Sequence, residues 1–214
     1  MAVVVKICGI NDLVAMRTAV EAGARYVGLV FYPRSPRAVN PNVAAKLATL
    51  VPPSVTLTGL FVDPTDADLK DVLEKVPLRM IQLHGDETPE RVAEVKQLTG
   101  LKVMKAIPVL EAKDLDNIAA FEDVADMLLF DAKPPNHVDA MPGGNAQVFD
   151  WGLLHGKAFS KPWMLAGGLN ADNLVEAVRI TGAHIVDVSS GVEDAPGRKS
   201  PIKIREFIDL ASNL

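Results

Sequence analysis

The strongest constraint on the fold is a repeated alternation along the chain. Short, continuously apolar runs rich in β-branched residues are followed by longer segments with helical periodicity. Continuous rather than alternating apolar runs are typical of strands that are buried on both faces. We expect strands over residues 3–7, 26–31, 55–61, 80–83, 102–106, 127–130, 163–166 and 185–188. We expect helices over residues 11–22, 43–50, 65–75, 89–98, 113–120 and 171–181.

This order predicts an α/β fold, a single-domain (βα)8 TIM barrel over residues 1–214. An open doubly wound sheet is the alternative, but no GxGxxG motif follows the first strand. Four helices are expected to begin at capping residues, namely Asn11, Thr65, Thr88 and Asn170. The longest irregular stretch, residues 131–148, is expected to be a binding loop or lid.

Charge and cysteine content narrow the partners and the compartment. The chain has 22 basic and 27 acidic residues, which gives 22 − 27 = −5, and it has no basic run. Nucleic acid and membrane surfaces are therefore not expected partners, whereas a small anionic ligand is. A single cysteine, no signal-peptide pattern and no apolar span favour a cytoplasmic protein, either a monomer or a homodimer.

Polar residues gather where the expected strands end. In parallel barrels the active site lies at the C-terminal ends of the strands. The candidate site residues there are Cys8, Arg37, Gln82, His84, Asp131, Gly167, Gly168, Asn170, Asp187, Ser189, Ser190 and Gly191. A fold that needs only stability has no reason to place so many polar groups at one end.

The glycine-containing loops after strands seven and eight predict a phosphate site. Gly167-Gly168 and Ser189-Ser190-Gly191 expose main-chain amides near helix N-termini, where the helix dipole favours anions. Barrels frequently bind phosphate between these two loops. The alternative is that the glycines only permit tight turns.

Two of these residues suit acid–base chemistry. Cys8 is a candidate base or nucleophile if Lys6 or a helix dipole acidifies its thiol, and otherwise is a small buried apolar residue. Asp131 is a candidate general acid, the alternative being an ion pair with Lys133 or a helix cap.

Arg37 and His84 are candidate ligand contacts. The Arg37 guanidinium is suited to a ligand carboxylate, the alternative being a solvated loop charge. His84 is either a contact or a structural histidine at the rim. No HxH, HExxH or cysteine cluster is present, so no metal is expected, and no motif for another cofactor is found.

Taken together, these motifs resemble the phosphoribosylanthranilate isomerase family of tryptophan biosynthesis. The similarity runs in order through nearly the whole chain: Lys6-Ile7-Cys8-Gly9, Gly28-Leu29-Val30-Phe31-Tyr32-Pro33 through Arg37, Gly59-Leu60-Phe61-Val62, Gln82-Leu83-His84-Gly85, Asp131, Phe149-Asp150-Trp151, Gly167-Gly168-Leu169-Asn170, Asp187-Val188-Ser189-Ser190-Gly191-Val192-Glu193, and Pro196-Gly197 before Lys199. Each motif alone is weak, but the ordered set is specific.

The resemblance implies an Amadori rearrangement without a cofactor. N-(5-phosphoribosyl)anthranilate would become 1-(2-carboxyphenylamino)-1-deoxyribulose 5-phosphate. By analogy, Asp131 protonates the furanose oxygen, Cys8 removes the proton from sugar C2, and Arg37 holds the anthranilate carboxylate. The loops after strands seven and eight would hold the phosphate.

One departure from the family pattern and two alternatives accompany this hypothesis. Ala146 stands where the family commonly has a further glycine, so closure over the substrate is expected to differ. A sibling phosphate-binding barrel enzyme is the first alternative, with Lys6 as its catalytic lysine. A barrel that binds a phosphorylated ligand without turnover is the second, although such a protein needs neither Cys8 nor Asp131.

Overall fold

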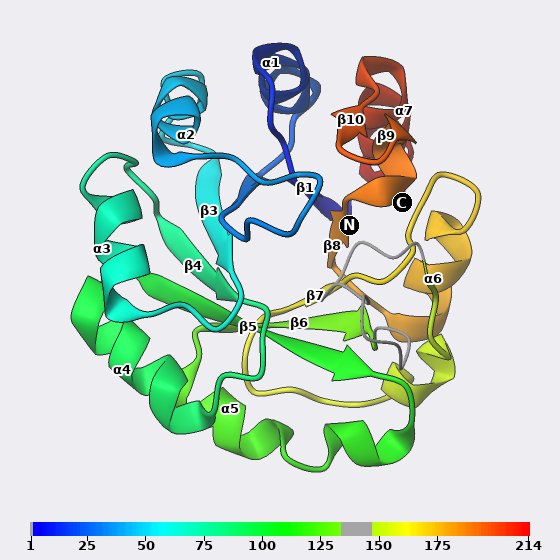
Figure 1. Ribbon diagram of the computed structural model, residues 1–214. Coiled ribbons are helices and arrows are strands. Elements are labelled where there is room, and N and C mark those ends of the chain that lie inside the picture. Colours follow the sequence, from blue (N-terminus) through cyan, green and yellow to red (C-terminus); the bar gives the residue numbers. More distant parts are fainter. Residues whose placement is uncertain (1, 134–146) are drawn as a thin grey trace.

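The computed structural model describes residues 2–133 and 147–214, and their eight parallel strands close into a barrel in the order β1 to β8. Figure 1 shows the strands in the centre and the helices around them. The strands are β1 Val4–Cys8, β2 Tyr26–Val30, β3 Thr56–Phe61, β4 Met80–Leu83, β5 Lys102–Val109, β6 Met127–Ala132, β7 Trp163–Leu165 and β8 Ile185–Val188. The predicted fold class is confirmed, although β5 continues beyond the predicted end to Val109.

The helices that cover the barrel are α1 Leu13–Ala22, α2 Pro41–Ala48, α3 Asp66–Leu73, α4 Pro89–Thr99, α5 Ile118–Val124, α6 Leu174–Thr181 and α7 Pro201–Ser212, with 3-10 turns η1 Ala112–Leu115, η2 Trp151–Leu154 and η3 Ser190–Val192. The single helix predicted over residues 113–120 is wrong, because η1 and α5 occupy this segment as two separate pieces. The final helix α7, not among the predicted ones, packs against α1 and so completes the outer ring.

Two of the four predicted helix caps are correct. Thr65 and Thr88 each accept a hydrogen bond from a main-chain amide in the first turn of α3 and α4. The predicted cap Asn11 is wrong, because Asp12 accepts the corresponding bond at the start of α1. The predicted cap Asn170 is also wrong: its side chain organises a turn that precedes α6.

The interior of the barrel contains two distinct kinds of residue. A group that we call the methionine cluster consists of Met80, Met104, Ala106, Met127, Leu129, Met164 and Ala166, on strands β4 to β7 and at the end of β7. On β1 and β8, by contrast, the fully buried Lys6 pairs with Asp187. The methionine cluster and the Lys6–Asp187 pair therefore occupy different strands of the same barrel.

The remaining elements lie outside this core. A two-stranded antiparallel hairpin, β9 Glu193–Ala195 and β10 Arg198–Lys199, follows β8 and was not predicted. Most of the predicted loop over residues 131–148, including Ala146, lies outside the described residues. Within the two described ranges, no helix combines the length and apolar character needed to span a bilayer.

Candidate functional site

A cavity opens at the C-terminal ends of the strands, where most of the residues singled out in the sequence come together. Those that line it are Cys8, Arg37, His84, Asp131, Gly167, Gly168, Asp187, Ser189 and Ser190. Gln82 is not among the lining residues but is buried and contacts His84. Asn170 and Gly191 line an adjoining hollow beside the glycine loops.

One wall of the cavity is apolar, which the sequence analysis did not anticipate. It is formed by Val30, Tyr32, Leu60 and Val62, around the ends of β2 and β3. Aromatic and aliphatic side chains of this kind suit a flat apolar group on a ligand. The cavity therefore combines an apolar wall with polar groups on the remaining strands.

Cys8 lies in this cavity beside a buried ion pair. Lys6 precedes it by two residues on β1, so both side chains point into the barrel. The Lys6 Nζ lies 3.0 Å from Asp187 Oδ1. Burial alone would lower the pKa of Lys6, but Asp187 and the nearby thiol outweigh this effect and raise it, so Lys6 is an ammonium group.

The ionisation of Cys8 is decided by two opposing effects. Burial raises the pKa of the thiol, and the charge of Lys6 opposes this without overcoming it. The proximity to Lys6 foreseen in the sequence is present, but its acidifying effect is the smaller one. In the free protein near neutral pH the thiol is therefore mainly protonated.

Asp131 is held at the end of β6 by a chain of hydrogen bonds. Its Oδ2 lies 3.1 Å from His84 Nε2, and Gln82 Nε2 lies 2.9 Å from His84 Nδ1. If the Gln82 amide donates to Nδ1, the ring carries its hydrogen on Nε2 and points it at Asp131. The alternative partner proposed from the sequence is wrong, because Lys133 pairs with Asp114.

The two glycine loops form the opposite side of the cavity. Gly167 and Gly168 have φ values of +87° and +64°, and a β-carbon on either would come within 2.8 Å of main-chain atoms. A β-carbon on Gly191 would lie 1.9 Å from the carbonyl oxygen of Leu169, so the loops touch. These glycines are therefore required by the tight turns of the two loops, as the alternative interpretation held. Tight turns are compatible with main-chain amides that face a ligand.

The helix starts near these loops differ from those predicted. The 3-10 turn η3 begins at Ser190, directly within the loop after β8. By contrast, α6 begins only at Leu174, after the turn that Asn170 organises. The expectation of a helix start directly beside Gly167-Gly168 is therefore wrong.

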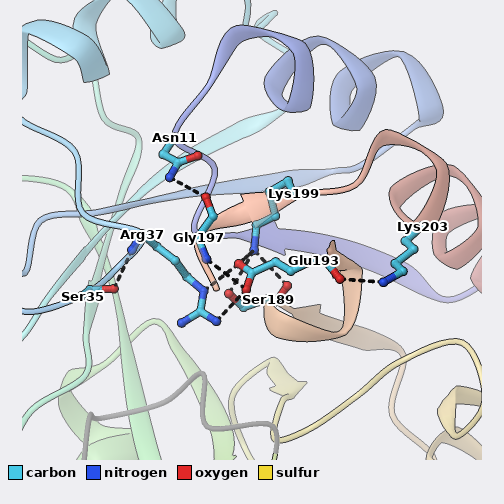
Figure 2. A network of polar contacts seen from close by, with 8 residues as sticks. All are labelled: Asn11, Ser35, Arg37, Ser189, Glu193, Gly197, Lys199 and Lys203. Atoms are coloured by element: carbon cyan, nitrogen blue, oxygen red, sulfur yellow. Dashed lines mark hydrogen bonds and ion pairs between the residues drawn. The ribbon is translucent and has the colours of Figure 1, made fainter. Parts of the chain in front are cut away.

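Arg37 is buried rather than solvated, so the alternative interpretation from the sequence is wrong. Its Nε lies 2.8 Å from Glu193 Oε1 and its Nη2 lies 2.9 Å from Glu193 Oε2. Figure 2 shows this two-pronged contact together with Lys199, whose Nζ lies 2.7 Å from the same carboxylate. Glu193 and Lys199 belong to the sequence motifs quoted above, but nothing local in the sequence paired them with Arg37.

The acidic and basic groups do not form a metal site in the part of the chain that is described. No group of three or more histidine, cysteine, aspartate or glutamate side chains is arranged to hold an ion there. Cys8 and Asp131 instead face one cavity from β1 and β6, which are not neighbouring strands. Chemically, this arrangement offers a thiol and a carboxyl group to the same ligand.

Comparison with known proteins gives one consistent family. The model of the family described as N-(5'phosphoribosyl)anthranilate (PRA) isomerase matches residues 5–210. N-(5'-phosphoribosyl)anthranilate isomerase of Rhodospirillum centenum is 59% identical over 214 residues, which is 100% of both chains. The crystal structure of phosphoribosyl anthranilate isomerase from Thermotoga maritima has a TM-score of 0.88 at 35% identity, covering 99% of this chain and 100% of that one.

A further similar structure is that of a complex with a ligand. It is phosphoribosyl anthranilate isomerase in complex with reduced 1-(o-carboxyphenylamino)-1-deoxyribulose 5-phosphate. It has a TM-score of 0.82 at 33% identity and covers 99% of this chain and 100% of that one. The similarity therefore extends over the whole barrel.

Proposed function

Since this chain belongs to the N-(5'-phosphoribosyl)anthranilate isomerase family, we propose that it converts N-(5-phosphoribosyl)anthranilate into 1-(2-carboxyphenylamino)-1-deoxyribulose 5-phosphate in tryptophan biosynthesis. Residues 1–214 form its single catalytic domain. The observation that carries the proposal is that Cys8 and Asp131 line one cavity together with Arg37 and the glycine loops.

The first step opens the sugar ring. Asp131 donates a proton to the furanose oxygen, the C1–O bond breaks, and the anthranilate nitrogen supplies the electron pair of the new C1=N bond. His84 supports this step because it holds the Asp131 carboxyl at 3.1 Å and so fixes its orientation. A positioned acid of this kind contributes about 10²–10⁴-fold to a rate.

The second step moves a proton from C2. The Cys8 thiolate removes it, and the electrons shift to give an enolamine that carries a hydroxyl on C2. Tautomerisation then returns a proton to C1 while the hydroxyl proton leaves, which gives the ketone. The sum is an isomerisation with no net gain or loss of atoms or electrons, so the chemistry needs no cofactor.

The remaining residues divide between the two ends of the substrate. Arg37 binds the anthranilate carboxylate, and the apolar wall around Leu60 accepts the aromatic ring. The amides of Gly167, Gly168, Ser189, Ser190 and Gly191, with Asn170, bind the phosphate. Asp187 acts from β8, where it holds the ammonium group of Lys6 next to the base.

The sibling-enzyme alternative is less well supported. A catalytic lysine that attacks or deprotonates a substrate must be neutral for part of the time. The pKa of Lys6 is raised because Asp187 outweighs the effect of burial, and Lys6 does not line the described cavity. Lys6 is therefore better suited to electrostatic support of Cys8.

A fluorescence assay with phosphoribosylanthranilate tests the proposal. We expect the wild type to consume the substrate, and Cys8→Ser and Asp131→Asn to lower kcat/KM by about 10²–10⁴-fold. Asp126→Asn is the matched control, because Asp126 directly precedes the same strand, at the end remote from Asp131, and pairs with Lys96. Wild type without turnover, or either site variant with full activity, would refute the assignment.

Location and assembly stay predictions from the sequence. A single cysteine suits a reducing compartment, and we accordingly propose the cytoplasm. The partner is the small phosphorylated substrate, and the protein acts as a monomer or a homodimer. Sedimentation of the purified protein distinguishes the last two.

A further inference from the structure

The β9–β10 hairpin places two buried charges at the edge of the cavity. Glu193 and Lys199 are paired across the hairpin and are only 8% and 4% exposed. Burying an ion pair costs desolvation free energy that its mutual attraction often fails to repay. Stability of a short hairpin alone therefore does not explain why it contains a buried ion pair.

Glu193 fixes the plane of the Arg37 guanidinium. Both carboxylate oxygens take part, with distances of 2.8 Å to Nε and 2.9 Å to Nη2. Such a two-pronged contact defines orientation as well as distance. Burial would raise the pKa of Glu193, but the hydrogen bond from Arg37 and the charge of Lys199 outweigh it and lower the pKa, so the carboxylate is ionised at neutral pH.

The hairpin also packs closely against the segment that carries Arg37. A β-carbon on Gly197, at the tip, would lie 2.3 Å from the carbonyl oxygen of Pro36. A β-carbon on Gly9 would lie 2.5 Å from Arg37 Cδ, so the arginine side chain crosses the backbone directly after Cys8. Asn11 Nδ2 donates to Gly197 O at 2.8 Å and joins the loop after β1 to the same tip (Figure 2).

Lys199 connects the same carboxylate to the loop after β8. Its Nζ donates to Ser189 O at 2.9 Å and lies 3.2 Å from Ser189 Oγ. Glu193 therefore contacts Arg37 directly and is connected through Lys199 to the loop after β8, which we propose binds the phosphate. Burial lowers the pKa of Lys199, and the charge of Glu193 opposes this effect. The group of this network that lines the cavity and suits a carboxylate ligand is the Arg37 guanidinium.

We infer that Glu193 and Lys199 are positioning residues that set recognition of the substrate's aryl carboxylate by holding Arg37 in place. This inference rests on the proposed function. Glu193 touches Arg37 rather than the substrate. Its removal therefore weakens binding of the carboxylate end more than it affects the chemical step.

The experiment compares two inhibitors that differ only at the carboxylate. One is the reduced product, and the other is the same compound built from aniline instead of anthranilate. We expect Glu193→Gln to raise the inhibition constant of the first by about 10–100-fold, the range for hydrogen bonds to charged groups. The constant of the second and kcat should change by less than about threefold.

A combined variant separates positioning from a general structural role. If Glu193 acts through Arg37, then Arg37→Ala with Glu193→Gln is no worse than Arg37→Ala alone. Asp194→Asn is the matched control, because Asp194 lies in the same hairpin but is exposed and faces Lys203. If Glu193→Gln does not fold, Glu193→Asp keeps the charge, withdraws it from Arg37 and should show the same selective loss.

Three results would overturn the inference, namely equal weakening of both inhibitors, additive effects in the combined variant, or tighter binding of the carboxylated inhibitor by Glu193→Gln. The last would mean that Glu193 competes with the ligand for Arg37. Each of these results counts against the inference only if the wild type turns over the substrate. A wild type without turnover overturns the proposed function instead, so the two failures are distinguishable.

Discussion

The two halves of the barrel interior are built on opposite physical principles. On β4 to β7 the methionine cluster fills the interior with apolar side chains, each nearly inaccessible to solvent. On β1 and β8 the same interior contains the Lys6–Asp187 ion pair. Apolar burial stabilises the fold, whereas a buried pair loses hydration that it only partly recovers.

This contrast indicates which part of the interior influences the ionisation of Cys8. The charged half lies beside Cys8, and the charge of Lys6 lowers the pKa of the thiol against the larger effect of burial. The methionine cluster contains no charged side chain, and the proposed acid on the same strands, Asp131, is not part of the cluster and lies near the end of β6. We therefore expect substitutions in the two halves to separate stability from activity.

The largest expected effect is that of breaking the buried pair. Lys6→Met should destabilise the protein by about 3–5 kcal/mol, because Asp187 is left buried without its partner. Lys6→Met with Asp187→Leu should recover most of this stability but not the activity. Urea unfolding and the fluorescence assay measure the two quantities separately.

A second ion pair serves as the control for this comparison. Lys96 and Asp126 lie 2.8 Å apart but are 42% and 27% exposed. Lys96→Met should cost only about 0.2–1 kcal/mol, because solvent screens a pair at the surface. If Lys6→Met proves equally mild, the interior around Lys6 is better hydrated than its burial implies.

The sequence predicted the barrel because its signal is repeated and local. Apolar runs identify strands buried on both faces, and the ends of parallel strands converge. Cys8, His84 and Asp131 could therefore be expected near one another although they are distant in the chain. The helix over residues 113–120 was wrong, because a 3-10 turn interrupts a segment that reads as one continuous helix.

The parts that could not be predicted depend on contacts between distant residues. Arg37 and Glu193 are 156 positions apart, and no local pattern joins them. The β9–β10 hairpin has strands too short to show the alternation that identifies a strand. The pKa of Cys8 depends on how burial and the charge of Lys6 balance, which the sequence does not determine.

A substitution in the methionine cluster is the next test of the contrast. Met104 is fully buried on β5, so Met104→Ala should cost about 2–5 kcal/mol through lost apolar contacts and the cavity left behind. The kcat of the folded variant should be unchanged. Met104→Leu is the matched control and should cost less than about 1.5 kcal/mol. A large loss of kcat in Met104→Ala at full folding would show that the two halves are coupled.

The smallest expected effect is a change in pH dependence. The base must be a thiolate, and burial raises the pKa of Cys8 above its ordinary value. In Asp131→Asn, whose residual turnover depends on the thiolate but no longer on a titrating acid, kcat/KM should therefore rise by up to about tenfold per pH unit and should still be rising near about pH 8.5, the ordinary pKa of a thiol. Replacement by a more acidic base, Cys8→Asp, should abolish this rise.

The same profile distinguishes the two halves of the interior. The charge of Lys6 lowers the pKa of Cys8, whereas the charge of Asp187 raises it. Lys6→Met with Asp187→Leu removes both effects at once. Lys6 has the larger effect, so the rise should move to higher pH. Met104→Ala introduces no charge and should leave it in place. A rise that shifts equally in both variants would mean that packing, rather than the charges on β1 and β8, controls the ionisation of the thiol.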